Sequence, residues 1–296
     1  MDFNSLSDGI SKSGLAVKSV VLIENDKKST FFPDGDKPSN TLSITKTFVA
    51  TALGICVDNG LMRTSDPFIK YFPELSEYTP GFELITIDNL LNMTPGHDKQ
   101  YLMERQRPKL KETDYLQYVA SRPLPYPPGK HFLYENSPTY LISRAVEKAS
   151  GVPLREMLKE ALEPCDIKIY DWLTCPMGYV LGGSTLHTRA GDMARLGLIY
   201  LNGGELDGKR IVSREWVEYA TARRYDAPGY PLKDLGYGGS FWFGGIEGFR
   251  CEGRLGQYIF MLPKRQAVLA IISNEPHMSR IFDLVANWLK EQPAAS

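Results

Sequence analysis

The sequence predicts a mixed α/β protein of the α+β type, in which the sheet is antiparallel. An antiparallel sheet flanked by helices is built from both chain ends, and an all-helical domain is inserted between them. Three features predict this: a β-branched run near the N-terminus, helix start and stop signals in the middle, and aromatic and β-branched runs alternating with turn residues in the last third. We expect the first strand and the last strands to pair in one sheet. The predicted division is 1–62 with 205–296 for the sheet domain and 63–204 for the helical insertion.

The first sixty residues predict one strand and one helix. The stretch "LAVKSVVLIEND" ends in Asn25 and Asp26, which close a β-branched strand. The Pro, Gly and Asp residues of "STFFPDGDKPSN" indicate a loop. A helix opened by Ser43 follows, and Asn59-Gly60 is expected to end it.

The middle of the chain contains residues that typically begin and end helices. Thr86 is a predicted N-cap for "TIDNLLNM". In "SPTYLISRAVEKASG", Ser137 is the predicted cap, Pro138 the first helical residue and Gly151 the stop. These signals predict a domain of short helices.

Strand signals dominate the last third. The stretch from "GYGGSFWFGG" to "LAIISNEP" alternates aromatic and β-branched runs with Gly, Pro and Lys-Arg turns, which predicts three or four antiparallel strands. "RIFDLVANWLKEQ" then predicts an amphipathic helix that closes the chain.

Composition excludes several classes of protein. The chain has 296 residues, of which 43% are hydrophobic and 23% charged, as in a globular protein. A net charge of −1 argues against nucleic acid as a partner. No apolar run reaches the ~18 residues that a membrane span needs. The polar N-terminus shows no signal peptide, so a cytoplasmic location is expected, with a trimmed exported form as the alternative.

Cysteine and histidine spacing predicts neither a disulfide framework nor a metal site. The four cysteines contain no C-x-x-C pair and are expected to be free thiols. The four histidines lie far apart in the sequence and match no ligand spacing. We therefore expect no metal and no organic cofactor.

Ser43 and Lys46 stand three residues apart at the start of an apolar helix. Positions i and i+3 share a helix face, so Ser43 Oγ and Lys46 Nζ are able to touch. The apolar flank desolvates the lysine and lowers its proton affinity. A neutral lysine takes a proton from serine and makes the hydroxyl nucleophilic. The alternative is a solvated helix start with Ser43 or Thr41 as the N-cap.

Two further elements are needed for acyl transfer. Tyr134 and Asn136 precede a capped helix, where functional side chains are often displayed, and Lys46 is a cation able to stabilise a tyrosine phenolate. The alternative is that Tyr134 packs and Asn136 makes a turn. The backbone N–H of Ser43 is one candidate oxyanion donor, and the glycine-rich strand holding Gly253 is a natural place for another.

These motifs resemble the serine hydrolases of the β-lactamase and penicillin-binding-protein superfamily, and its class C β-lactamase-like branch in particular. Ser43-Ile44-Thr45-Lys46 is similar to the S-x-x-K motif, and Tyr134-Glu135-Asn136 to Y-x-N. The segments "TIDNLLNMTPGHD", "GGSTLHTRAGDMARLGLIYLNGGELDGKRIVSREWV" and "GQYIFMLPKRQAVLAIISN" extend the resemblance over nearly the whole chain. It implies a β-lactamase/transpeptidase-like fold.

The resemblance also implies roles for the residues. Ser43 is the acylated nucleophile, Lys46 and Tyr134 share acid–base work, and Asn136 binds substrate or orients Lys46. The third motif, K-T-G or H-x-G, falls on Cys251-Glu252-Gly253, and the second oxyanion N–H is that of Arg254. Asn136, Glu252, Gly253 and Arg254 are thus the expected substrate-binding residues.

The third motif departs from the family pattern, because Cys251 replaces a basic residue and Glu252 lies beside it. In the family that basic group helps to bind a substrate carboxylate, so a carboxylate-bearing substrate is disfavoured. Arg250 and Arg254 are candidate substitutes. Arg250 and Glu252 are expected to share a strand face that Cys251 does not. No separate carboxylate base for deacylation stands out, because Asp192 and Glu163 are expected to be helix-surface charges.

The sequence therefore predicts a serine hydrolase that cleaves an ester or amide through an acyl-Ser43 intermediate, acting on a small molecule or short peptide. One alternative is a β-lactamase or D,D-carboxypeptidase. Another is a catalytically weak homologue that binds a ligand or peptide, which the altered third motif keeps open.

Overall fold

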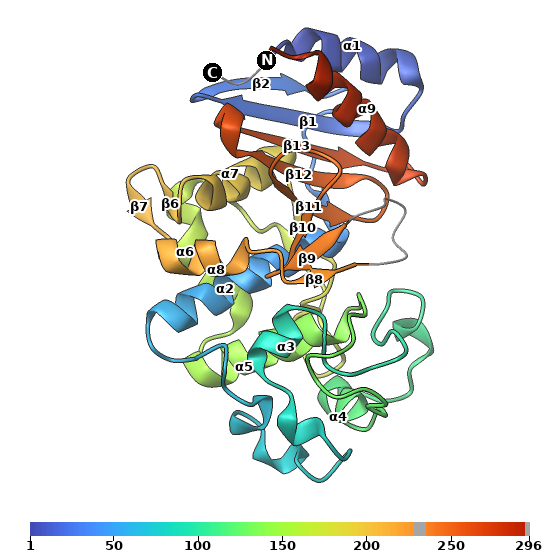
Figure 1. Cartoon of the computed structure of the whole chain (residues 1–296), viewed down its shortest axis with the longest axis vertical. Helices are drawn as coiled ribbons and strands as arrows, with labels where there is room; N and C mark the ends of the chain where they lie inside the picture. Colours follow the sequence, from blue (N-terminus) through green and yellow to red (C-terminus); the bar gives the residue numbers. More distant parts are fainter. Residues whose placement is uncertain (228–234, 294–296) are drawn as a thin grey trace.

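The computed structural model describes residues 1–227 and 235–293. It has a sheet with helices on both faces at one end and a group of short helices and turns at the other (Figure 1). The α-helices are α1 (Phe3–Ser13), α2 (Thr45–Asp58), α3 (Ile87–Leu91), α4 (Tyr115–Ala120), α5 (Ser137–Ser150), α6 (Leu154–Leu162), α7 (Ala190–Leu201), α8 (Arg214–Ala220) and α9 (Met278–Glu291). The strands are β1 (Val17–Glu24), β2 (Lys27–Phe31), β3 (Ser39–Asn40), β4 (Asp171–Trp172), β5 (Leu186–Thr188), β6 (Glu205–Leu206), β7 (Lys209–Arg210), β8 (Tyr225–Asp226), β9 (Gly236–Gly238), β10 (Phe241–Phe243), β11 (Phe249–Gly253), β12 (Gln257–Leu262) and β13 (Ala267–Ser273).

The main sheet joins the two ends of the chain. Among the described residues its strand order is β2-β1-β13-β12-β11-β10-β9-β8, and every neighbouring pair is antiparallel. Strand β1 lies beside β13, with Val21 opposite Ala270. The prediction of an antiparallel sheet built from both chain ends and flanked by helices is confirmed.

Alternate residues of the central strands face two separate apolar layers. Val20 and Leu22 pack with α1 and α9 on one face, whereas Val21 and Ile23 belong to the large core around α2. Helix α7 covers the second face too, and a Cβ on its Gly197 would lie 2.6 Å from a methyl group of Val268. The predicted helical insertion of 63–204 includes α7, although this helix packs against the sheet. The domain division stays a prediction.

Helix ends follow the expected signals with two exceptions. Thr86 caps α3 as predicted, and Gly151 ends α5 in a left-handed conformation. The prediction that Ser137 caps α5 is wrong: the cap position is Asn136, because the Ser137 hydroxyl donates to Glu135 instead. Ser43 does not open α2 directly but lies in a 3-10 turn before it.

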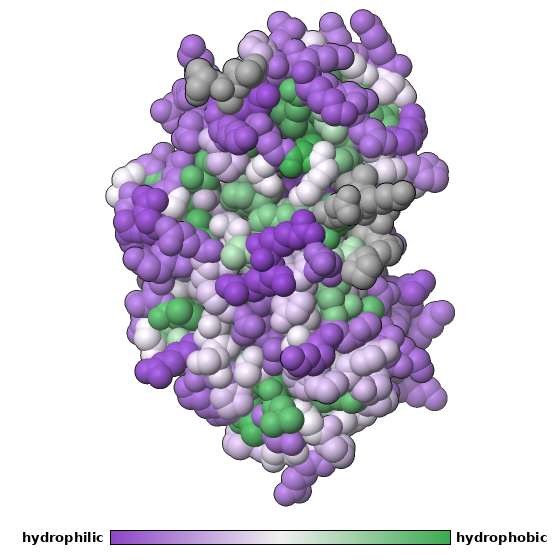
Figure 2. Space-filling view, in the orientation of Figure 1, coloured by the Kyte–Doolittle hydropathy of each residue, from purple (hydrophilic) through white to green (hydrophobic). Residues whose placement is uncertain are grey.

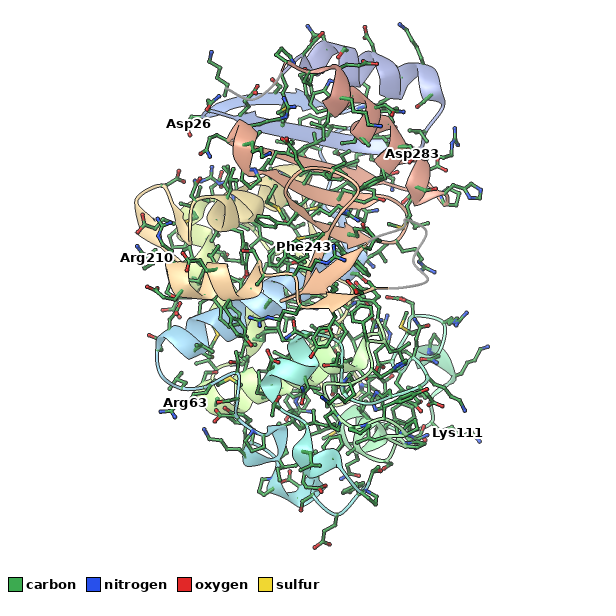
Figure 3. The ribbon with its side chains drawn as sticks, viewed as in Figure 1. Asp26, Arg63, Lys111, Arg210, Phe243 and Asp283 are labelled. Atoms are coloured by element: carbon green, nitrogen blue, oxygen red, sulfur yellow. The ribbon has the colours of Figure 1, made fainter. Side chains whose placement is uncertain are left out.

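The last third contains more strands than the three or four predicted. Five strands, β9 to β13, lie between Gly236 and Ser273 in the described part, because β9 and β10 are separate three-residue strands. In Figure 3 the labelled residue Phe243, on β10, lies near the middle of the molecule, between the sheet end and the helical end.

The visible surface is mainly polar. Figure 2 shows hydrophobic residues on this face in small, separate patches among hydrophilic ones. Large apolar side chains that are exposed, such as Leu61, Leu84 and Met177, come from different segments. Every described helix is too short or too polar to span a bilayer.

Candidate active site

Ser43 lies in the 3-10 turn Leu42–Ile44, immediately before α2. The backbone N–H and the hydroxyl of Thr41 both donate to the carbonyl oxygen of Leu186, at 2.8 and 3.0 Å, and anchor the entry to this turn. Leu42 then takes a left-handed conformation with φ 52°, which costs an L-residue roughly 1–2 kcal/mol. Strain of this kind persists where the surrounding structure over-determines it, so Ser43 has a constrained backbone.

Lys46 lies in the first turn of α2 and is buried. Its Nζ is 3.0 Å from Ser43 Oγ, as the i, i+3 spacing predicted. The same Nζ donates to Asn136 Oδ1 at 2.7 Å and to the carbonyl oxygen of Gly183 at 2.7 Å. These contacts hold the amine against the serine hydroxyl.

The surroundings of Lys46 shift its proton equilibrium. Burial lowers the pKa of Lys46 to about 7, and the positive charge of Arg107 also lowers it, whereas Glu104 and Glu135 oppose this effect. A substantial fraction of Lys46 is therefore neutral near pH 7. That is the state in which a lysine accepts a proton from serine.

Asn136 ends the loop that leads into α5, and its side chain points at Lys46. It is buried behind the lysine, in a position from which it can orient Lys46, and this role stays a prediction. Gly183 packs directly against it, since a Cβ on Gly183 would lie 2.6 Å from the Asn136 Cβ. A larger residue at position 183 would displace Asn136.

Tyr134 brings an aromatic ring to the same place. Lys46 Nζ lies over this ring, 4.9 Å from its centroid. Trp242 and Tyr237 hold the ring from the sheet side, with centroid distances of 5.0 and 5.6 Å. Gln100 fixes the backbone by donating to the carbonyl oxygen of Tyr134 at 2.8 Å.

The residue between Tyr134 and Asn136 has a structural role. The buried carboxylate of Glu135 accepts hydrogen bonds from the Tyr101 backbone N–H at 2.8 Å and the Ser137 hydroxyl at 2.7 Å, and it pairs with His97 Nδ1 at 2.6 Å. This network ties the loop before α5 to the segment that follows α3. It fixes the backbone from which both neighbouring side chains project.

The C-terminal end of β11 lies beside the Ser43 turn. A Cβ on Gly253 would lie 2.5 Å from the Thr41 carbonyl oxygen, so glycine is needed here for close approach of the chain itself. Arg254 follows at the surface, and its backbone N–H donates no backbone hydrogen bond in the described part of the chain. This N–H and that of Ser43 are the candidate oxyanion donors.

Cys251 occupies the position where the family pattern has a basic residue. Its Sγ lies 3.1 Å from Thr47 Oγ1 and is buried against α2. Burial raises the pKa of the Cys251 thiol to about 12, with Glu252 contributing in the same direction. The position therefore presents a small, neutral, buried group.

Arg250 and Glu252 share the opposite face of β11, as the strand period predicted. Arg250 Nε donates to Glu252 Oε1 at 2.6 Å, and the guanidinium lies over the Phe282 ring, 4.8 Å from its centroid. Arg250 is fully buried by these contacts. The hypothesis that Arg250 substitutes for the missing basic residue is wrong, because its charge is already paired inside the protein.

One cleft of about 160 Å³ brings together most of the predicted residues. It is lined by Leu42, Ser43, Gln100, Met103, Glu104, Tyr134, Glu252, Gly253, Arg254 and Met278. Lys46 and Asn136 lie behind Ser43. Hollows of about 610 and 570 Å³ elsewhere are larger, but neither is lined by Ser43 or Tyr134, so volume does not identify the site.

Sequence reasoning missed Glu104 and Gly183. Glu104 belongs to the stretch "YLMERQRPKLKE", whose charge pattern is typical of a solvated loop, so it carried no signal. Gly183 was visible as part of a Gly-Gly-Ser turn, without a role. Asp192 is also more than a surface charge: it is buried, and its carboxylate accepts from the backbone N–H of Lys168 and of Arg189.

The sequence profile of the family described as Beta-lactamase matches residues 25–291. The chain belongs to the Beta-lactamase family. The S-x-x-K and Y-x-N resemblance thus extends to a match over most of the chain.

The proteins similar in sequence to this chain include a beta-lactamase and a 6-aminohexanoate-dimer hydrolase. A beta-lactamase of Pseudomonas fluorescens is 29% identical over 161 residues, which is 51% of this chain and 44% of that protein. A 6-aminohexanoate-dimer hydrolase of Paenarthrobacter ureafaciens is 24% identical over 264 residues, 79% of this chain and 66% of that protein. The chain thus matches less than two thirds of the length of either relative.

A solved structure of a family VIII carboxylesterase has the same fold. It superposes with a TM-score of 0.76 at 17% identity, covering 96% of each chain. A putative beta-lactamase of Bacteroides dorei superposes with a TM-score of 0.78 at 18% identity, covering 97% of this chain and 98% of that chain. With the family match, this confirms the β-lactamase/transpeptidase-like fold expected from the motifs.

Proposed function

We propose that this protein is a serine hydrolase that cleaves an ester or an amide through an acyl-Ser43 intermediate. The observation that carries the proposal is the buried Lys46 amine, 3.0 Å from Ser43 Oγ and with its pKa lowered by burial to about 7. The names of the relatives, which include beta-lactamase and 6-aminohexanoate-dimer hydrolase, support hydrolysis as the reaction class.

The hydrogen bonds of Lys46 fit a neutral amine that acts as a base. A neutral amine has two N–H donors and one lone pair. The donors satisfy Asn136 Oδ1 and the Gly183 carbonyl oxygen, and the lone pair accepts the Ser43 hydroxyl proton. As the Ser43 oxygen bonds to the substrate carbonyl carbon, its proton passes to Lys46 Nζ.

The other residues complete the reaction in this proposal. The backbone N–H groups of Ser43 and Arg254 stabilise the oxyanion, and the Tyr134 hydroxyl, supported by Lys46, delivers a proton to the leaving group. A water molecule then attacks the acyl carbon and gives its proton to the Tyr134 phenolate, and Lys46 returns its proton to the Ser43 oxygen as the acyl–Ser43 bond breaks and the acid product leaves. Ser43 is released with its hydroxyl restored.

The third motif favours substrates without a carboxylate. Cys251 supplies no charge, Arg250 is paired with Glu252, and Arg254 is the cation among the described residues that line the cleft. A β-lactam or a peptide C-terminus would carry its carboxylate toward a strand end where Cys251 supplies no cation and Glu252 already pairs with Arg250. An ester or amide with a neutral acyl group needs no cation at this position, and we favour this class of substrate.

The proposal is tested by intact-protein mass spectrometry with a fluorophosphonate probe. We expect one adduct on the wild type and none on Ser43→Ala, with matching loss of p-nitrophenyl acetate hydrolysis. A folded wild type that takes up no probe and turns over no ester would refute the proposal and favour a ligand-binding homologue. Rapid hydrolysis of penicillin would instead support a β-lactamase, and stable penicilloylation a penicillin-binding enzyme.

A further inference from the structure

The Asn136 amide is oriented by the segment that lines the cleft before α4. Its Oδ1 accepts from Lys46, and its Nδ2 donates to the Leu102 carbonyl oxygen at 3.2 Å and to Glu104 Oε1 at 3.3 Å. If the amide were flipped, its NH₂ group would face the lysine amine and its oxygen would face two acceptors. Leu102 and Glu104 therefore select the orientation that Lys46 needs.

The segment that carries Glu104 is held in place by its own side chains. Gln106 Oε1 accepts the Met103 N–H at 2.9 Å, while Gln106 Nε2 donates to the Gln100 carbonyl oxygen at 2.8 Å. Gln100 in turn donates to the carbonyl oxygen of Tyr134. Leu102 sits in a left-handed conformation, φ 57°, which turns its carbonyl toward Asn136. Glu104 therefore has a defined place.

Glu104 is an anion in this setting. Burial raises the pKa of its carboxyl, but the Glu104 backbone N–H, the charges of Lys46 and Arg107, and a hydrogen bond from Ser184 outweigh burial and lower it overall. The Arg107 guanidinium donates to Ser184 Oγ at 2.9 Å. Glu104 is thus a negative charge fixed close to Lys46.

Other charged or titratable groups also face Lys46 from the surrounding elements. They are Arg107 from the same segment as Glu104, Glu135 and Tyr134 from the loop before α5, and, on the wall of the cleft, Glu252 from β11 and Arg254 after it. Glu135 is engaged by three hydrogen-bond partners and Glu252 by Arg250. Glu104 is the carboxylate that also touches the Asn136 amide.

We propose that Glu104 is a positioning residue of the serine–lysine site. Its carboxylate holds the Asn136 amide with the oxygen toward Lys46 and stabilises the protonated amine. The effect of Glu104 on catalysis rests on the proposed function. Glu104 then opposes the effect of burial on the Lys46 pKa, and so raises the pH at which Ser43 becomes reactive.

The first test measures Lys46 directly and needs no turnover. In protein labelled with ¹³C-ε lysine, the Lys46 signal is the one missing from Lys46→Met, and an ordinary lysine titrates at about 10.4. Glu104→Gln keeps the shape and an acceptor oxygen but removes the charge. We expect its Lys46 midpoint to fall by about half a unit or more, a threefold or larger loss of proton affinity. The control Glu112→Gln, an exposed glutamate in the same stretch of chain, should leave the midpoint unchanged.

The second test separates charge from shape by kinetics. For Glu104→Gln, the rising limb of kcat/KM against pH should move to lower pH, because Lys46 loses its proton more easily. Glu104→Asp keeps the charge but retracts the carboxylate from Asn136. We expect it to leave the limb in place and to lower plateau kcat/KM about tenfold, as a misplaced group does.

The outcomes distinguish this inference from the proposed function. An unchanged or higher Lys46 midpoint in folded Glu104→Gln overturns the role of Glu104, whether or not the enzyme is active. If Glu104→Gln does not fold, an unshifted limb together with full plateau activity in Glu104→Asp overturns it. Absence of a Ser43 adduct in the wild type overturns the proposed function, while the ¹³C titration still decides whether Glu104 controls Lys46.

Discussion

Gly183→Ala tests whether the position of Asn136 controls reactivity at Ser43. A Cβ at position 183 would lie 2.6, 2.8 and 2.9 Å from the Cβ, Cγ and Cα of Asn136. Ordinary contact begins at 3.4 Å, so the two residues must separate by 3.4 − 2.6 = 0.8 Å. Gly183 has no left-handed backbone, so alanine there adds volume without conformational strain.

The expected loss follows from that displacement. Both Asn136 Oδ1 and the Gly183 carbonyl oxygen are 2.7 Å from Lys46 Nζ, so a shift of this size disturbs two of its three hydrogen bonds. A misplacement of about 1 Å at a catalytic centre costs on the order of a hundredfold in rate. We therefore expect kcat/KM to fall about 30- to 100-fold, about 2–3 kcal/mol in transition-state stabilisation. Overpacking should cost another 1–3 kcal/mol or so of folding free energy.

The assay compares Gly183→Ala with Gly9→Ala by ester hydrolysis, fluorophosphonate labelling rate and urea unfolding. Gly9 lies within α1, and a Cβ there would have no atom within 4 Å. Its replacement should leave kcat/KM unchanged and stabilise the helix by about 0.5–1 kcal/mol. A folded Gly183→Ala with wild-type kcat/KM would refute the argument that Asn136 and Gly183 hold Lys46 in its reactive position.

Two further predictions concern charge. With the Lys46 pKa at about 7 and neutral lysine as the base, kcat/KM should rise with pH through neutrality. At pH 6 it should be about a tenth of its plateau, and stopped-flow ester hydrolysis that stays flat between pH 5.5 and 8 or so would contradict this. Glu252→Gln removes the partner of the fully buried Arg250, so the free energy of unfolding should fall by about 3–5 kcal/mol in urea titration. The exposed Glu218→Gln is its control, and equal stability of the two variants would show that the buried pair is not needed.

Local sequence signals predicted the fold well where one interaction dominates. Thr86 caps α3 because its hydroxyl accepts a nearby backbone N–H, and Gly151 ends α5 because glycine tolerates a left-handed conformation. Ser137 shows where such signals fail. Its hydroxyl is drawn to the buried Glu135, which lies two residues away and is held by groups from another segment. The hydrogen bond from the Ser137 hydroxyl to Glu135 therefore replaces the helix-capping hydrogen bond that the local sequence predicted.

The same division applies to the site. The sequence alone determined that Ser43 and Lys46 lie one turn apart and that Arg250 and Glu252 share a strand face, because these relations follow from helix and strand periods. It also predicted that both chain ends build one sheet, from the strand signals at the two ends. Only the tertiary structure decided that Asn136 and Gly183 meet at Lys46 and that Glu104 acts on the same lysine. It also decided that Arg250 forms a buried ion pair with Glu252. These contacts join segments far apart in the chain, and the burial that lowers the pKa of Lys46 exists only once those segments have packed around it.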